Sequence, residues 1–308
     1  ILIAGSYDND NGVDIDPGPG TYLVNDNYAN NSSAPFAAKY SGIDGSLIWG
    51  ADFGHATTGC AIHDLDVDKN TGELIIGGWY KNQMLVNPNA SPGSFSYYAA
   101  PNQNYRHTLL IFVNSDGSYG GSWNYGAGEI PTVDFDDVGN HYIGANGGLR
   151  KNNSSFYEIQ INLFYKDIIA KGDGQLYLEG EHAANGLQDI DPDDSNFFSP
   201  NYPNSTQLIM KWDWSVTSAP SLVWHKNIDA DFYNFNKERF YIDADLNDKI
   251  YIGATYNGSI TPNISSTNTF TAIPCTPALS ACYDMYLNFA SVCSDTVFTY
   301  ETINVCSG

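Results

Sequence analysis

Residues 65–80 read LDVDKNTGELIIGGWY, and this stretch predicts the local structure that the rest of the chain repeats. Apolar and polar residues alternate on both sides of a turn rich in Asp, Asn and Gly, a pattern typical of a β-hairpin. Related acidic turns occur at VDFDDVGN, AKGDGQ and IDADLNDK, each followed by a short β-rich run that ends on a small residue. A hairpin that recurs along a chain indicates an internal repeat.

A second hairpin type accompanies the first. The segment DGSLIWGADFG at 44–54 matches DGSYGGSWNYG at 116–126 with an offset of 72 residues, and QLIMKWDWSVTSAPSLVWHKNI at 207–228 is a version with a longer turn. Gly5 and Gly78 lie 73 residues apart, so both hairpin types share one period. Two hairpins per repeat make four antiparallel strands, and four-stranded sheets in series are the blades of a β-propeller.

We therefore expect an all-β chain that forms a β-propeller of four-stranded antiparallel blades. Five units are recognisable, the third of them abbreviated, and six or seven blades are expected if the chain is a fragment. A Cys-bearing tail follows, which is either the last strand or the start of a further β-domain. The predicted units are 1–54, 55–126, 127–166, 167–228 and 229–292, and the tail is 293–308.

The stretch GVDIDPGPGTYLV at 12–24 is predicted to be a corner of the repeat. Its IDP at 15–17 recurs as VNP at 86–88, IDP at 190–192 and ITP at 260–262. It lacks the following helix and the lysine of a phosphate-binding P-loop. Two interpretations stay open: a turn stiffened by Pro and Asp, or a calcium loop in some of the copies.

Calcium is the candidate ligand because carboxylates alternate along several of these turns, and hard cations prefer oxygen ligands. An EF-hand loop counted from Asp66 needs Gly at its sixth position and Glu at its twelfth, where the chain has Thr71 and Gly77. Ordinary hairpin turns are therefore the competing interpretation. The candidate calcium ligands are Asp14, Asp16, Asp64, Asp66, Asp68, Asn70, Asp189, Asp191, Asp243 and Asp245.

The charge of the chain excludes some classes of partner. There are 35 Asp and Glu against 13 Lys and Arg, a formal net charge of −22, which repels nucleic acid and anionic membranes. No apolar run reaches the roughly 20 residues that span a bilayer, so membrane insertion is not expected. The chain opens on ILIAGSY without a signal-peptide core, which predicts a mature or trimmed segment of a longer secreted protein.

The cysteines are distributed unevenly. Cys60 stands apart, while Cys275, Cys282, Cys293 and Cys306 fall in the last 34 residues. In an exported protein these four suit two disulfides, and three pairings are open. Zinc is the alternative, but the spacing contains no C-x₂-C knuckle.

Catalytic motifs are missing from the sequence. Neither G-x-S-x-G nor H-E-x-x-H occurs, and the only adjacent His–acid pairs are His63-Asp64 and Glu181-His182. Glycosidases need two converging carboxylates, a feature that depends on the fold. We expect no catalytic residues, no enzyme activity and no cofactor other than calcium.

The repeat resembles the β-propeller repeats called SBBP, which occur in large secreted and surface proteins of bacteria. The resemblance rests on ILIAGSY, VDIDPGPGTYLV, PFAAKYSGIDGSLIWGADFG and LDVDKNTGELIIGGWY, and it covers about residues 1–292. The closing VCSDTVFTYETINVCSG resembles the start of small β-domains that follow such propellers in proteins exported by gliding bacteria. The resemblance implies a bacterial protein that is extracellular or on the cell surface and takes part in surface assemblies.

The leading functional hypothesis is a non-catalytic structural or adhesive module, a self-assembling subunit of an extracellular filament. A carbohydrate-binding propeller is the alternative, and a polysaccharide-acting enzyme is the second alternative. The expected partners are further copies, other surface proteins or glycans, because aromatic, Asn-rich loops at 95–107, 196–204 and 261–282 suit binding or subunit contacts. Asp295-Thr296-Val297 resembles an O-glycosylation signal of the same bacteria and predicts a glycoprotein.

Overall fold

The protein is described by a computed structural model, in which the described part of the chain is all-β. Among these residues there are strands and turns but no helix, and hence no helix long and apolar enough to cross a bilayer. The structure describes residues 1–7, 12–24, 34–53, 60–81, 83–85, 97–99, 105–127, 131–145, 148–152, 163–172, 174–182, 190, 206–215, 220–230, 239–244, 250–256, 260–261, 284–290 and 300–303.

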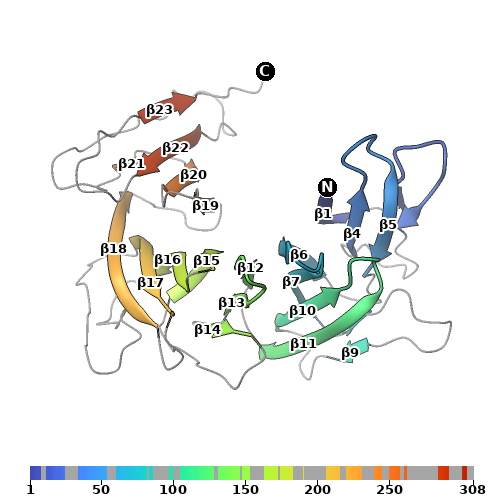
Figure 1. The fold of residues 1–308 in the computed structure, drawn as a ribbon, viewed down its shortest axis with the longest axis horizontal. Coiled ribbons are helices and arrows are strands. Elements are labelled where there is room, and N and C mark those ends of the chain that lie inside the picture. Colours follow the sequence, from blue (N-terminus) through green and yellow to red (C-terminus); the bar gives the residue numbers. More distant parts are fainter. Residues whose placement is uncertain are drawn as a thin grey trace. The chain divides into compact units, whose positions relative to one another are not determined.

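The chain divides into two compact units, Ile1–Asn146 and Gly147–Gly308. The strands of unit 1 are β1 (Leu2–Tyr7), β2 (Val13–Asp14), β3 (Leu23–Val24), β4 (Ala34–Tyr40), β5 (Leu47–Asp52), β6 (Cys60–Val67), β7 (Leu74–Tyr80), β8 (Gln83–Leu85), β9 (Tyr97–Ala99), β10 (His107–Val113), β11 (Tyr119–Ala127), β12 (Thr132–Phe135) and β13 (His141–Ala145) (Figure 1). Those of unit 2 are β14 (Gly148–Lys151), β15 (Leu163–Ala170), β16 (Gln175–His182), β17 (Thr206–Asp213), β18 (Ser221–Ala230), β19 (Arg239–Ala244), β20 (Ile250–Tyr256), β21 (Ile260–Thr261), β22 (Asp284–Ala290) and β23 (Tyr300–Ile303).

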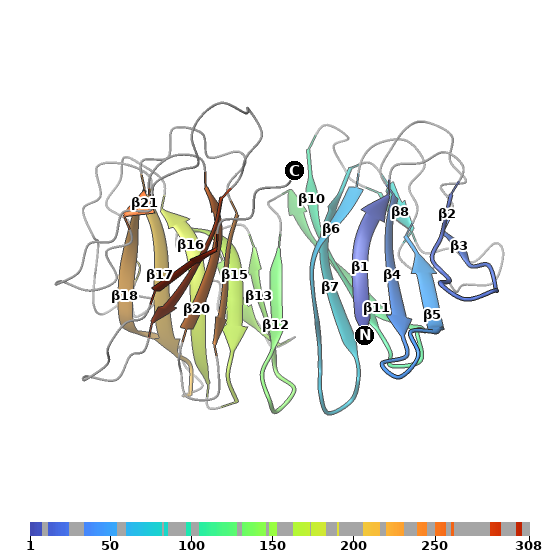
Figure 2. The same cartoon turned by 90° about the horizontal axis from the view of Figure 1, so that it is seen from above.

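Unit 1 contains consecutive antiparallel sheets. The first has the strand order β1-β4-β5 and the second the order β11-β10-β7-β6, and β12 pairs with β13 in a hairpin. Figure 2 shows β1, β4 and β5 running side by side. The pairs β2–β3 and β8–β9 form small two-stranded ribbons. The second sheet has the two hairpins in series that the sequence predicts.

The second sheet of unit 1 is covered on both faces. Its central strand β10 is buried at all seven positions, because alternate side chains enter two different cores. One core, shared with β4 and β5, contains Ala37, Ala51, Phe53, Cys60, Leu74, Ile76, Tyr80, Leu109, Ile111 and Val113. The other, shared with β12 and β13, contains Ile75, Leu110, Phe112, Val133, Phe135 and Ile143.

The acidic turns are hairpin turns, as the sequence predicts. The N–H of Asp68 donates to the carbonyl of Glu73 at 2.8 Å, and the N–H of Gly72 donates back to Asp68 at 2.7 Å. A corresponding pair of bonds in a turn one residue shorter closes the hairpins at Asp136 in unit 1 and at Lys171 in unit 2. Each of these three turns joins the first two strands of its sheet in chain order.

The second hairpin type brings neighbouring sheets together. Trp49, on β5, lies against the β10–β11 turn and donates from its indole Nε1 to the carbonyl of Ser115 at 3.3 Å. Gly117 in that turn has a φ of +85°, and a Cβ atom there would lie 2.7 Å from Cγ of Trp49. The turn therefore requires glycine both for its backbone conformation and for the space that the indole ring occupies.

Gly117→Ala is expected to lower the free energy of unfolding by about 1–3 kcal/mol, because it adds left-handed strain to a steric clash. Gly42→Ala is the matched control, since that Cβ would meet nothing within 4 Å. We expect the control to be neutral or stabilising by about 0.5 kcal/mol. Urea unfolding followed by tryptophan fluorescence measures both, and equal effects of the two substitutions would contradict the prediction.

Unit 2 contains two larger antiparallel sheets. One has the order β15-β16-β17-β18-β21 and the other the order β19-β20-β22-β23. Figure 2 shows β16, β17 and β18 side by side. The strand β19 contacts both β15 and β16, so the first strand of one sheet packs on the first hairpin of the other.

The division of the chain into five repeat units stays a prediction, and the strand bounds can be compared with the predicted unit boundaries. The strand β15 runs from Leu163 to Ala170, so it crosses the predicted boundary between 166 and 167. In the predicted tail, β23 pairs with β22, with Met285 opposite Ile303.

Candidate functional site

The corner at 12–24 is held by its own carboxylates. Oδ1 of Asp14 accepts hydrogen bonds from the N–H groups of Asp16 at 3.0 Å and Tyr22 at 2.9 Å, and Oδ1 of Asp16 accepts from Gly18 at 2.8 Å. The hydroxyl of Tyr40 donates to the carbonyl of Ile15 at 2.8 Å. The corner thereby buries Ile15 and covers the face of the first sheet that carries Ala38.

The two carboxylates of the corner thus satisfy turn backbone groups, so we expect no calcium site at this corner, and the thermal unfolding midpoint should respond to calcium in the same way in Asp14→Asn as in the original chain. The measurement is differential scanning calorimetry with calcium and with a chelator. A calcium ion that binds the folded chain would add about 2.7 kcal/mol to the free energy of unfolding when free calcium is at 100 times the Kd. A rise in the midpoint with calcium that Asp14→Asn abolishes would contradict this expectation and support a calcium site.

In unit 1, Asp64 on β6 links its sheet to β12. Oδ2 accepts from the N–H of Val133 at 2.8 Å and from Oγ1 of Thr132 at 2.9 Å, while Oδ1 accepts from the N–H of Leu65 at 2.9 Å. Burial raises the pKa of Asp64, and the three hydrogen bonds offset part of that increase. The carboxylate therefore serves two backbone N–H groups in different sheets.

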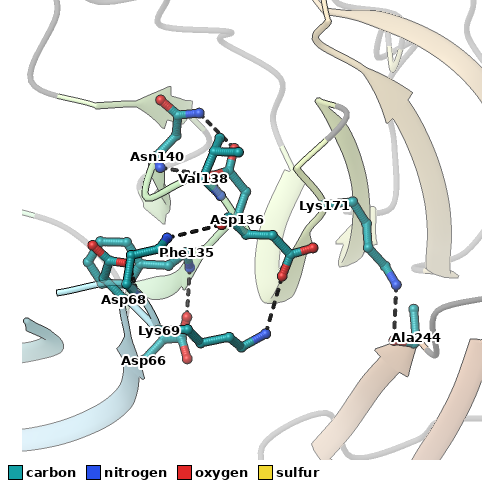
Figure 3. A network of polar contacts seen from close by, with 11 residues as sticks. Asp66, Asp68, Lys69, Phe135, Asp136, Val138, Asn140, Lys171 and Ala244 are labelled. Atoms are coloured by element: carbon teal, nitrogen blue, oxygen red, sulfur yellow. Dashed lines mark hydrogen bonds and ion pairs between the residues drawn. The ribbon is translucent and has the colours of Figure 1, made fainter. Parts of the chain in front are cut away.

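Asp66 and Asp68 continue this contact toward the hairpin turn. Oδ2 of Asp66 accepts from the N–H of Phe135 at 2.7 Å (Figure 3). Together with Asp64, two carboxylates of β6 therefore bond to β12. Asp68 accepts from the N–H of Asn70 at 2.8 Å and from Oγ1 of Thr71 at 2.7 Å. Burial alone would raise the pKa of Asp68, but these hydrogen bonds outweigh it and lower the pKa.

Asp167 on β15 repeats the arrangement of Asp64 in unit 2. Oδ1 accepts from the following N–H, that of Ile168, at 3.0 Å, and Oδ2 accepts from Ile242 on β19 at 2.8 Å. Nearby, Nζ of Lys171 donates to the carbonyl of Ala244 at 3.2 Å, a second bond between the sheets (Figure 3). Among the described residues, Asp64 in unit 1 and Asp167 in unit 2 each bond through their two oxygens to N–H groups of two successive sheets.

A β-bulge places both aspartates. The register shifts between Ile62 and Asp64 on β6 and between Tyr165 and Asp167 on β15, which leaves His63 and Lys166 as the extra residues. A bulge adds one residue to one strand and re-aims the side chain that follows it.

The remaining candidate ligands divide into described and undescribed residues. Oδ1 of Asp243 accepts from the N–H of Ala244 at 2.8 Å. Asp189, Asp191 and Asp245 lie outside the described residues, as do Cys275, Cys282, Cys293 and Cys306. Among the residues that the structure does describe, no group of three or more His, Cys, Asp or Glu could hold a metal ion. Calcium at the undescribed turns and the disulfides stay predictions.

Glu179 on β16 is a buried acid that sequence reasoning missed. It has no exposed surface, and in the described part of the chain neither of its oxygens has a hydrogen-bond partner. The residue opposite Glu179 on the neighbouring strand β15 is Asp167. Glu179 therefore occupies the position in unit 2 that Gly77 occupies in unit 1. Burial raises its pKa well above the usual value, and the charge of Asp167 raises it further. A carboxyl group among alternating strand residues gives no signal of burial in the sequence.

The first of the adjacent His–acid pairs, His63 and Asp64, has a separate hydrogen-bond partner for each member. Nε2 of His63 accepts a hydrogen bond from Nε1 of Trp79 at 2.8 Å, whereas Asp64 bonds to β12. In the other pair, Glu181 lies 3.9 Å from Nζ of Lys166. The two members of the first pair therefore have separate partners, although they are neighbours in the chain.

Comparisons with known proteins add no assignment. No protein-family model matches the chain, and a search of curated proteins finds no match. The described geometry is therefore the basis of the functional argument.

Proposed function

We propose that this chain is a non-catalytic structural or adhesive module with a β-propeller fold, part of an exported bacterial protein of the SBBP-like kind. One observation carries the proposal. Acidic residues that could have formed a catalytic or metal site, Asp64, Asp66 and Asp167, instead accept hydrogen bonds from backbone N–H groups of the next sheet. These carboxylates hold sheets together.

The arrangement within each unit supports the propeller part of the proposal. Antiparallel meanders follow one another along the chain, and the first strand of one sheet contacts the first strand of the next, β6 with β12 and β15 with β19. Propeller blades are four-stranded antiparallel sheets that repeat in this way around a central channel. The sheet that is buried on both faces in unit 1 fits a blade between two neighbours.

A structural module of this kind acts by associating with copies of itself or with other surface proteins. The test is light scattering of the purified chain, whose monomer mass is 33.7 kDa, together with electron microscopy of the native material. We expect masses above the monomer and ordered polymers or rings. Monodisperse monomers that release reducing sugar from a polysaccharide would overturn the proposal in favour of an enzyme.

A further inference from the structure

An aromatic and cationic patch lies at one end of the second sheet of unit 1. It consists of His63, Trp79, Lys81, Tyr105 and Arg106, and we call it the Trp79 patch. Strand pairing places Tyr80 opposite His107, so Lys81 and Arg106 flank that pair at the same end of the sheet. In a chain with a net charge of −22 and only three arginines, two cationic residues side by side are a local exception.

The patch has a defined internal order. The guanidinium of Arg106 lies over the ring of Trp79, with Cζ 4.5 Å from the ring centroid. His63 accepts the indole N–H of Trp79 at 2.8 Å, which fixes the plane of the ring. Because Nε2 of His63 is the acceptor in this bond, the imidazole is neutral in this arrangement and the charge of the patch comes from Arg106 and Lys81.

Arg106 is exposed and available to a ligand. It forms no ion pair with any residue in the described ranges, and its described contact is the one with Trp79. Tyr105 beside it is 58% exposed, a high value for a tyrosine ring. Stacking on an indole holds a guanidinium in place without using its N–H donors. The guanidinium of Arg106 can therefore donate two parallel hydrogen bonds to one carboxylate.

The fold itself does not require these residues. In unit 2 the equivalent bulge residue is Lys166 and the residue equivalent to Trp79 is Glu181, as the strand registers show. There the two side chains form an ion pair with N–O 3.9 Å. The same junction is thus built without an aromatic ring in unit 2, and the architecture gives no reason for the Trp79 patch in unit 1.

We propose that the Trp79 patch binds a uronic-acid-containing oligosaccharide. The fork of Arg106 takes the carboxylate, and the exposed ring of Tyr105 takes the apolar C–H face of a sugar, since aromatic rings supply large amphipathic contact areas. Charge favours this ligand over an acidic peptide. A run of negative charges is repelled by the rest of a chain at −22, whereas a single carboxylate needs only the local cations. This binding goes beyond the structural role and does not depend on it.

The test is isothermal titration calorimetry of the full chain with a trisaccharide that has one glucuronate between two glucose residues, here called the glucuronate trimer, and, as the neutral match, a trimer of glucose. We expect saturable binding of the glucuronate trimer that weakens as salt rises, and binding of the glucose trimer at least about tenfold weaker, because a charged hydrogen-bonded pair is lost. A trimer of glutamate is the third probe, and we expect it to bind more weakly than the uronate.

Matched variants locate the binding. Arg106→Gln is expected to lower the affinity for the glucuronate trimer about tenfold or more. The double substitution His63→Lys with Trp79→Glu installs the pair that unit 2 uses, so it is expected to fold and to lose binding. Lys69→Gln removes one positive charge from an exposed lysine whose ion-pair partner is Asp137, and it is expected to bind like the original chain.

Loss of binding in Arg106→Gln and in the double variant, with Lys69→Gln unchanged and all three unfolding at the original urea midpoint, supports the patch. No saturable binding of the glucuronate trimer, equal affinity of Arg106→Gln and Lys69→Gln, or tighter binding of the glutamate trimer would each overturn the proposal.

Discussion

Asp64→Ala is expected to lower the free energy of unfolding of unit 1 by about 2–4 kcal/mol, the largest loss we predict for a single substitution. The carboxylate accepts from Val133, Thr132 and Leu65, and its removal leaves two backbone N–H groups without their acceptor between packed sheets. A buried donor that loses its partner keeps the full cost of its lost hydration.

The amide in Asp64→Asn tests this explanation. It retains one acceptor oxygen, but its NH₂ group faces a backbone donor, so we expect an intermediate loss. Asp116→Ala is the matched control, because Asp116 is exposed and its bonds to Ser118 are replaceable by water. The control is expected to change stability by less than about 1 kcal/mol.

Hydrogen exchange of the β12 amides, with urea unfolding of the whole chain, gives the measurement. We expect the amide of Val133 to exchange faster in Asp64→Ala than in the original chain. Equal losses of stability in Asp64→Ala and Asp116→Ala would mean that Asp64 does not join the two sheets.

Glu179→Met is expected to stabilise unit 2 by about 1–3 kcal/mol at pH 8, because it removes a buried acid without a hydrogen-bond partner in the described structure. Methionine is close to glutamate in length and can occupy the same buried position. The gain depends on pH because the pKa of Glu179 is raised in the folded protein by burial first and by Asp167 second.

The sign of the pH dependence follows from linkage. A carboxyl group with a raised folded pKa holds its proton where the unfolded chain has released it. Its favourable contribution is therefore complete below the ordinary glutamate pKa and is lost as pH rises from there toward the raised folded pKa. The original chain should lose stability across this window, whereas Glu179→Met and Glu179→Gln should lose less.

Urea unfolding between pH 4 and pH 9 measures the profile. Glu181→Gln is the matched control, since Glu181 lies on the same strand but is partly exposed and 3.9 Å from Lys166. Its substitution is expected to change the profile less than that of Glu179. A profile for Glu179→Gln that parallels the original chain would show that Glu179 does not titrate in this window.

Sequence reasoning found the hairpins because their determinants are local. The turn that begins at Asp68 is closed by Gly72 and by hydrogen bonds within six residues, and the corner around Asp14 and Asp16 is held by N–H groups close in the chain. Such patterns of Asp, Asn, Gly and Pro are legible without knowing what packs on them. The all-β class and the antiparallel hairpins followed from these patterns and are confirmed.

The roles of individual acidic residues could not be predicted from the sequence in the same way. Asp14, Asp64 and Asp68 look alike in the sequence, yet the first stabilises a corner, the second joins two sheets and the third closes a turn. Glu179 and Glu181 are two residues apart, yet only Glu179 is fully buried. Residues two apart in a strand lie on the same face, so the difference depends on what packs over each position, which the alternation of the sequence does not show.

By itself, the sequence determined where the strands turn and that they pair as antiparallel hairpins, because backbone conformation in turns depends on residues close in the chain. Only the tertiary structure decided which carboxylate oxygens join neighbouring sheets and which aromatic ring stacks with Arg106. Those contacts depend on the bulges at His63 and Lys166 and on the spacing of stacked sheets. The contacts between sheets join residues about 70 apart, such as Asp64 with Val133 and Asp167 with Ile242.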